Sequence, residues 1–396
     1  MIRVITSLLF CILPSLCAPL HAQQAITPTT EDPLVRYASI RNEIARAIEK
    51  GNAYLKKQQS PEGIWSDESY PAMTALACTA AMRSPDLAGK AIPAYLEKAY
   101  EFILRSQKED GSIYNKGLAS YNTSVCMMAL MAVPTSAYDK SILQARAYLV
   151  NQQTHFAPDS PYNGGIGYGG KDAPPVADLS NTVLALEAIR YSSKLAKDSQ
   201  HGPQPDLDWQ AAMDFVSRCQ QPESHPDSND RGGFRYRPTE ASIQATSPAH
   251  PGKKGRRGEK EPATAYGSMT YAGLQSLIYA NLSKDDPRVK AALNWLATHY
   301  TVDENPGTGV DGLYYYYQSM AKALSAAGID QLPLKDGSFV DWRQDLAKKI
   351  VSLQQSDGSW VNTSNRWWEK DSILVTAYCV LALEQLYNSM AQPSAN

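Results

Sequence analysis

The sequence has few of the residues that build metal sites and almost no excess of charge of either sign. Its six cysteines show no Cys-x-x-Cys spacing, which argues against a zinc knuckle. Its six histidines are scattered and do not supply a Ser-His-Asp nucleophile at any recognisable spacing. The net charge of −2 at pH 7 argues against nucleic acid or an anionic membrane as the main partner.

Long apolar runs are also missing after the first 22 residues, so no later segment is expected to cross a membrane. The chain begins with Arg3, an apolar run from Val4 to Leu13, and the small-residue ending Leu20-His21-Ala22. This order is typical of a signal peptide, and the apolar run is too short for a stable transmembrane helix. We expect residues 1–22 to be cleaved from an exported periplasmic or extracellular protein, with residues 23–36 as a polar leader.

What the sequence does have is a recurring helical hairpin, clearest near the C-terminus. Leu346, Ile350 and Leu353 follow helical spacing and lead into a Gln-x-x-x-Gly-x-Trp turn at residues 354–360. An almost wholly apolar helix is expected from Ile373 to Leu383. An amphipathic helix, a turn and a buried helix therefore make one repeating unit.

Earlier copies of this unit recur along the chain, and the second helices share a threonine at one register. The ends of the first helices, or the turns after them, are Gln59-x-x-x-Gly63-x-Trp65, Gln107-x-x-x-Gly111-x-Ile113, Gln152-Gln153, Cys219-Gln220 and a degenerate fifth copy around Tyr300. The threonines of the second helices are Thr74, Thr123, Thr182, Thr270 and Thr376. An open solenoid would need polar end caps, which neither terminal copy has. We expect six hairpins closed into one ring over residues 37–390, with a surface loop at 237–263.

The repeat resembles the QW motif of the squalene–hopene cyclase and protein prenyltransferase β-subunit superfamily, over about residues 40–386. The resemblance implies an all-α protein, an α/α toroid (α6/α6 barrel) with the second helix of each hairpin inside and the first outside. The Gln and Trp of that motif are structural in the family. We expect their side chains to bind backbone groups at helix ends.

One catalytic motif of that superfamily is only partly matched. Cyclases that protonate an alkene use Asp-x-Asp-Asp-Thr, which clusters carboxyls in a dry pocket to make a strong acid. In this sequence Asp178 and Thr182 match, but Ser180 and Asn181 replace the second and third Asp. Alkene protonation is therefore not expected, and a helix N-cap is the favoured role for Asp178.

The zinc site of the prenyltransferases is also incomplete. The Asp of its Asp-x-Cys element matches Asp311, but Leu313 stands in place of the Cys and Val375 in place of the His. Two of three ligands are missing, so we expect no metal. The Gly-rich loop at residues 163–170 lacks the features of a phosphate cradle, and no cofactor is expected.

Polar and aromatic residues at the starts of the inner helices remain as site candidates. Asp178, Asp311 and Asp371 each precede an inner helix and would lie at the same mouth of the ring, as catalytic candidates or as helix caps. Aromatic residues that would line the cavity are Tyr314, Tyr317 and Trp367, with ordinary core packing as the alternative.

Three functions follow from this pattern. The first is an exported protein of terpene-cyclase or prenyltransferase type that binds an apolar, isoprenoid-like molecule in its central cavity. If it is an enzyme, its activity would be cyclase-, mutase- or prenyltransferase-like with a non-standard site. The second is a non-catalytic interaction or scaffold toroid. The third is a carbohydrate-active α/α barrel, which would need two carboxylates facing each other across a cleft.

Overall fold

A computed structural model describes residues 32–155, 160–170, 176–200, 202–225, 227–238 and 264–391. These residues form fourteen α-helices, two 3-10 helices and one two-stranded hairpin. The helices are α1 (Pro33–Arg36), α2 (Ala38–Gln58), α3 (Pro71–Arg83), α4 (Ala94–Arg105), α5 (Ala119–Met131), η1 (Ser136–Tyr138), α6 (Asp139–Asn151), α7 (Leu179–Tyr191), α8 (Ser193–Lys197), α9 (Trp209–Cys219), α10 (Gly267–Tyr279), α11 (Pro287–Thr298), α12 (Leu313–Ala326), α13 (Trp342–Ser352), η2 (Arg366–Trp368) and α14 (Ser372–Ser389), and the strands are β1 (Leu332–Pro333) and β2 (Phe339–Val340).

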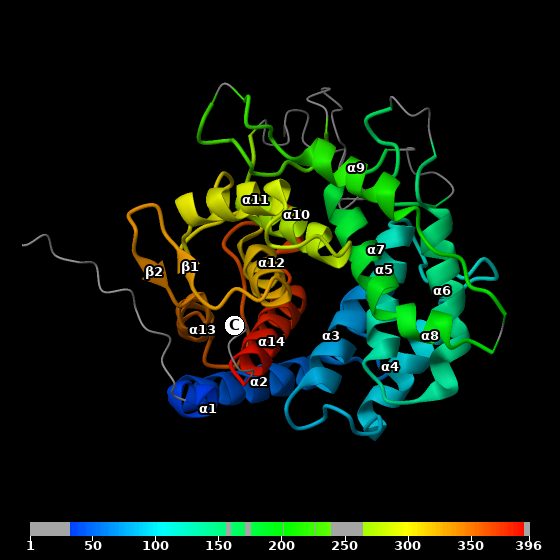
Figure 1. Cartoon of the computed structure of the whole chain (residues 1–396). Coiled ribbons are helices and arrows are strands. Elements are labelled where there is room, and N and C mark those ends of the chain that lie inside the picture. The colour runs from blue at the N-terminus through cyan, green and yellow to red at the C-terminus, as the bar shows by residue number, and fades with distance from the viewer. Residues whose placement is uncertain are drawn as a thin grey trace, which may run out of the picture.

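Six of the helices form a closed inner ring. Contacts between neighbours run from α3 to α5, α7, α10, α12 and α14, and from α14 back to α3. The outer helices α2, α4, α6, α9, α11 and α13 pack around this ring (Figure 1). The chain is therefore an all-α toroid of six helical hairpins, as the repeat predicts.

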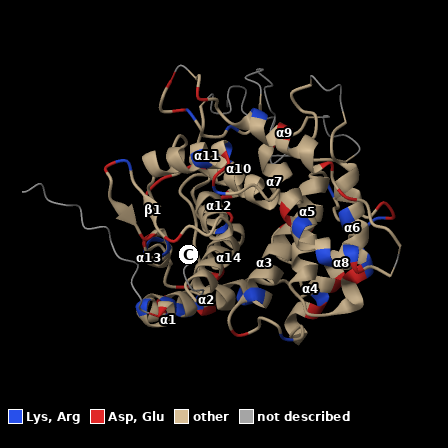
Figure 2. Ribbon diagram, in the orientation of Figure 1, with Lys and Arg blue, Asp and Glu red and all other residues tan. Residues whose placement is uncertain are grey.

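The burial of the two helix sets follows from their sequences. Twelve of the thirteen residues of α3 are buried, because this helix is covered by neighbours on nearly every side. By contrast, α4 buries the stripe formed by Leu96, Ala99, Tyr100 and Ile103 and leaves its other face to solvent. Lys, Arg, Asp and Glu lie mainly on the outer helices and their loops (Figure 2).

In five of the six hairpins, a glutamine of the turn links its own hairpin to the next one. The Gln59 side-chain amide donates to the Gly63 carbonyl at 3.0 Å and to the Tyr95 carbonyl of α4 at 2.9 Å. Gln354, in the last hairpin, donates to the Gly358 carbonyl and to the Ala47 carbonyl of α2, both at 3.0 Å. Gln107, Gln153 and Gln220 make the same pair of bonds in the second, third and fourth hairpins. The bond from Gln354 to α2 thus joins the end of the ring to its beginning.

The shared threonine holds the turn onto the inner helix. The Thr74 hydroxyl accepts a hydrogen bond from the Trp65 backbone N–H, and Thr376 does the same for Trp360, both at 3.1 Å. Thr123, Thr182 and Thr270 accept equivalent bonds. The indole of Trp360 in turn donates to the Ile350 carbonyl at the end of α13. The turn residues are therefore structural, as the resemblance implies.

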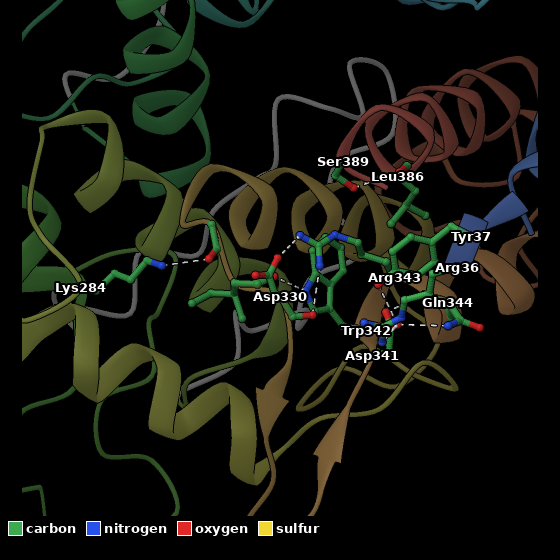
Figure 3. A network of polar contacts seen from close by, with 12 residues as sticks. Arg36, Tyr37, Lys284, Asp330, Asp341, Trp342, Arg343, Gln344, Leu386 and Ser389 are labelled. Carbon is green, nitrogen blue, oxygen red and sulfur yellow. Dashed lines mark hydrogen bonds and ion pairs between the residues drawn. The ribbon is translucent and has the colours of Figure 1, made fainter. Parts of the chain in front are cut away.

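The first described residues contact the start of α13. Asp32 caps α1, and Arg36 forms an ion pair with Asp341 at 3.0 Å. The Tyr37 hydroxyl donates to the same carboxylate at 2.9 Å (Figure 3). These two contacts therefore join Arg36 and Tyr37 to the N-cap residue of α13.

Some predicted segments lie outside the described residues. These are the signal peptide at 1–22, residues 23–31 of the leader and residues 239–263 of the long loop between α9 and α10. In the part of the chain that the structure describes, no helix is both long and apolar enough to cross a bilayer.

Candidate functional site

The inner helices enclose a central cavity, called the bore below, which is mainly apolar. The space that the centre of a water molecule can reach in it is about 40 Å³. The bore therefore has room for a few water molecules. Its walls come from α3, α5, α7, α12 and α14. The lining residues are Leu76, Thr79, Arg83, Tyr121, Ser124, Val125, Met128, Leu184, Glu187, Tyr315, Gln318, Lys322, Tyr378 and Leu381.

Helical periodicity explains which side chains reach the bore. Tyr315, Gln318 and Lys322 follow one another at i, i+3 and i+7 on α12, so they share one face of that helix. The lining residues of α3 follow the same spacing and end at Arg83. Tyrosines therefore lie near the N-terminal ends of the inner helices, and charged groups lie toward their C-terminal ends.

The tyrosine end of the bore is built from three inner helices. The hydroxyls of Tyr121 and Tyr378 lie 3.4 Å apart, and the Tyr315 hydroxyl lies 3.3 Å from the Ser180 hydroxyl. Burial raises the pKa of Tyr315 to about 12, so this phenol stays neutral at physiological pH. The group can donate a hydrogen bond and present an aromatic wall, but it is not a base under those conditions.

The opposite end of the bore is charged. The Lys322 ammonium forms an ion pair with Glu187 at 2.8 Å, and the Tyr279 hydroxyl donates to the same carboxylate at 3.4 Å. Gln275 donates to the Tyr279 hydroxyl at 2.9 Å. Arg83 donates to the Gln385 side chain at 3.4 Å. The charged residues of the bore thus come from three different inner helices.

Asp178 lies at the start of α7 and is fully buried. Its carboxylate accepts hydrogen bonds from the Asn181 backbone N–H at 2.8 Å and from the Asn181 side-chain amide. Burial raises the pKa of Asp178 to about 6, although the Asn181 N–H and the Arg237 charge oppose this shift. The geometry is that of a helix N-cap, the role that the sequence favours for this residue.

The other two predicted carboxylates are held in separate places. Asp371 caps α14 by accepting from the Ile373 and Leu374 backbone N–H groups, and it also accepts from Ser66. Asp311 accepts from the Ser364 hydroxyl at 2.6 Å. Within the described residues, no hydrogen bond or ion pair connects any two of the three aspartates. None of them belongs to the bore lining given above.

The aromatic residues expected to line the cavity pack within its wall. The Tyr314 hydroxyl donates to the Val361 carbonyl at 3.3 Å, and the Tyr317 hydroxyl donates to the Val302 carbonyl at 2.6 Å. Trp367 stands over Gly312, where an added Cβ would lie 2.7 Å from its ring. Of the tyrosine run at the start of α12, it is Tyr315 that faces the bore, because successive residues point 100° apart.

Glu369 is a buried carboxylate that the sequence pattern does not single out. It accepts hydrogen bonds from the backbone N–H groups of Tyr314 and Tyr315, at 3.3 and 2.8 Å, and from the Asn362 amide. It therefore caps α12 from a segment more than fifty residues away. Burial raises the pKa of Glu369 to about 7, against the effect of these donors.

The residues at the zinc-ligand positions lie in the core. Leu313 is 7% exposed and Val375 is fully buried. Among the described residues, no three His, Cys, Asp or Glu side chains are grouped so that they could hold a metal ion. The described cysteines are four free, buried thiols, and burial raises the pKa of the Cys78 thiol above its usual range.

No family model and no curated protein matches the chain. Solved structures do: the type II terpene cyclase MstE from Scytonema, in its apo form, is 13% identical, with a TM-score of 0.53 over 88% of this chain and 99% of that chain. A variant of MstE in complex with its substrate, geranylgeranyl dihydroxybenzoate, is also 13% identical over 89% of this chain and 99% of that chain, with a TM-score of 0.51. The protein geranylgeranyltransferase-I of Candida albicans, complexed with GGPP, is 12% identical over 87% of this chain and 99% of that chain, with a TM-score of 0.45. The chain therefore has the toroid fold of terpene cyclases, and at this identity the likeness concerns the fold alone.

Proposed function

We propose that this chain is an exported toroid that binds an apolar, isoprenoid-like molecule in its bore, without an Asp-x-Asp-Asp acid or a zinc site. The observation that carries the proposal is the closed ring of inner helices around a bore lined by Leu76, Val125, Leu184 and Leu381, with three tyrosines at one end. Apolar walls with a few polar groups are typical of small-molecule sites. The MstE complex with a geranylgeranyl compound agrees with this kind of ligand.

The size of the bore sets a condition on binding. Ligand pockets usually measure about 300–1,000 Å³, whereas the bore has room for a few water molecules. A bound isoprenoid chain therefore requires side chains to move aside. Met128 and Leu184 are half-buried at the bore wall, and the unbranched, flexible Met128 side chain is suited to such a change.

A direct test is to extract the purified protein with organic solvent and identify released molecules by mass spectrometry. Binding of added farnesol would be measured in parallel by calorimetry. Leu184→Trp places a large ring in the bore and should abolish binding. Leu353→Trp, at a half-buried position after the outer helix α13, is the matched control and should leave it intact. Equal farnesol binding by wild type and Leu184→Trp would refute the bore as the site.

A second candidate is a non-catalytic interaction or scaffold protein, and the narrowness of the bore favours it. In that case the wild-type protein releases no apolar molecule and binds no farnesol. Incubation of the protein with linear isoprenoids, followed by mass spectrometry, separates binding from turnover, since only an enzyme changes their structure.

Export is tested separately. The mature protein should be recovered from the periplasm or the medium with an N-terminus that begins at Gln23. An intact Met1 on protein from the cytoplasm would refute this part of the proposal.

A further inference from the structure

Among the described residues, the lining of the bore has one more positive than negative charge. Two cations, Arg83 and Lys322, line the bore together with one carboxylate, Glu187, which leaves one unmatched positive charge. Lys322 and Glu187 form an ion pair with each other at 2.8 Å. The unmatched charge is therefore that of Arg83.

The surroundings of Arg83 leave most of its guanidinium unused. Its one hydrogen bond to the described residues is a long bond of 3.4 Å to Gln385, and it has no ion pair within this part of the chain. The neighbouring acid Glu384 is buried, and neither of its side-chain oxygens has a hydrogen-bond partner in the described part of the chain. Burial raises the pKa of Glu384 well above its usual range, against the effect of the Arg83 charge. Among the described residues, no ion pair joins the Glu384 carboxyl to Arg83.

Two further polar groups of the bore are also buried. Ser124 is 1% exposed and lines the bore, and its hydroxyl has no hydrogen-bond partner among the described residues. The Gln318 amide lies on the same face of α12 as Lys322 and is buried as well. Buried polar groups are usually paired in folded proteins, so an unpaired one in a cavity points to a polar ligand group or water.

We propose that the charged end of the bore binds the carboxylate of an apolar acid, with Arg83 as the main contact and the chain of the acid lying toward the tyrosines. A guanidinium offers parallel N–H groups that match the two oxygens of a carboxylate. One unmatched positive charge suits a head group with one negative charge better than a diphosphate. This inference rests on the proposed function and specifies the chemistry of the ligand.

Three ligands with the same isoprenoid chain test the inference on the full-length protein: farnesoic acid, farnesol and farnesyl diphosphate, with binding followed by calorimetry. Farnesoic acid should bind at least tenfold more tightly than farnesol and more tightly than the diphosphate. Arg83→Gln should reduce the affinity for farnesoic acid to that for farnesol, and a circular dichroism spectrum like that of the wild type would show that the variant is folded. Arg83→Lys keeps the charge but loses the paired donors, and it should give an intermediate affinity.

Arg190→Gln is the matched control, because Arg190 also lies in the last turn of an inner helix but is exposed and outside the bore lining. It should bind all three ligands as the wild type does. Equal affinity of the wild type for farnesoic acid and farnesol would overturn the carboxylate site while leaving the proposed function intact. Tightest binding of the diphosphate would overturn the choice of head group, and binding of none of the three would refute both proposals.

Discussion

Ring closure by Gln354 can be tested with a single substitution, Gln354→Ala. The side-chain amide donates two hydrogen bonds of 3.0 Å, one to the Gly358 carbonyl in its own turn and one to the Ala47 carbonyl of α2. The second bond joins residues 307 positions apart in the sequence. It is therefore a polar link between the last hairpin and the first.

The expected loss follows from the state of each carbonyl after substitution. The Ala47 carbonyl lies inside α2 and keeps its helical hydrogen bond, so losing the second bond costs about 1 kcal/mol. Gly358 is buried, and its carbonyl loses the partner that Gln354 supplies, which costs about 1–3 kcal/mol. The free energy of unfolding should fall by about 2–4 kcal/mol in total.

Urea unfolding followed by circular dichroism measures this change. Gln107→Ala removes the equivalent pair of bonds between two internal hairpins and should lose a similar amount. Gln355→Ala, at the exposed neighbouring position, removes one acceptor of the Ser359 hydroxyl, which keeps its 2.7 Å bond to Asp357. It should change stability by less than about 0.5 kcal/mol. If Gln354→Ala is as stable as Gln355→Ala while Gln107→Ala is destabilised, the closing bond contributes nothing and the reasoning is wrong.

Three further predictions concern the turn, a helix cap and the thiols. Thr376→Val leaves the buried Trp360 N–H without its acceptor, so urea unfolding should show a loss of about 1–3 kcal/mol; an unchanged midpoint would contradict this role. Burial raises the pKa of Asp178 to about 6, above its ordinary value of 3.8, so the stability that protonated Asp178 contributes below pH 3.8 is lost as the pH rises through 6. Asp178→Asn keeps an N-cap residue, so its free energy of unfolding should exceed that of the wild type at pH 8 by up to about 3 kcal/mol and be similar at pH 3.5. The four buried thiols should not react with a disulfide reagent in the folded protein, and after unfolding four should react if residues 1–22 have been removed, or six if they are retained.

Much of the fold could be predicted from the sequence because its determinants are local and repeated. Gln59, Gly63, Trp65 and Thr74 lie within sixteen residues, and their hydrogen bonds close one turn onto one inner helix. Such a motif leaves its glutamine and its threonine in five of the six copies. Its recurrence predicts both the six hairpins and their closure, and the role of Asp178 as a cap follows from its place before a helix.

Which residues line the bore is decided by the tertiary structure, because the lining depends on how each inner helix is rotated about its axis. The sequence marks four consecutive tyrosines on α12 but not that Tyr315, rather than Tyr314 or Tyr317, faces inward. In the helices that carry the shared threonine, the positions two, five and nine residues after it offered a signal that could have found Arg83. Lys322 lies on α12, which has no threonine at that register.

Contacts between distant segments left no local signal at all. Glu369 caps α12 although more than fifty residues separate them in the sequence, and Glu187 forms an ion pair with Lys322, which lies 135 residues later. Nothing in the residues around either acid specifies its partner, since the pairing exists only once the ring has closed. The sequence by itself determined the repeating hairpin and its turn, while packing of the six inner helices decided which charges share the bore and which carboxylates became helix caps.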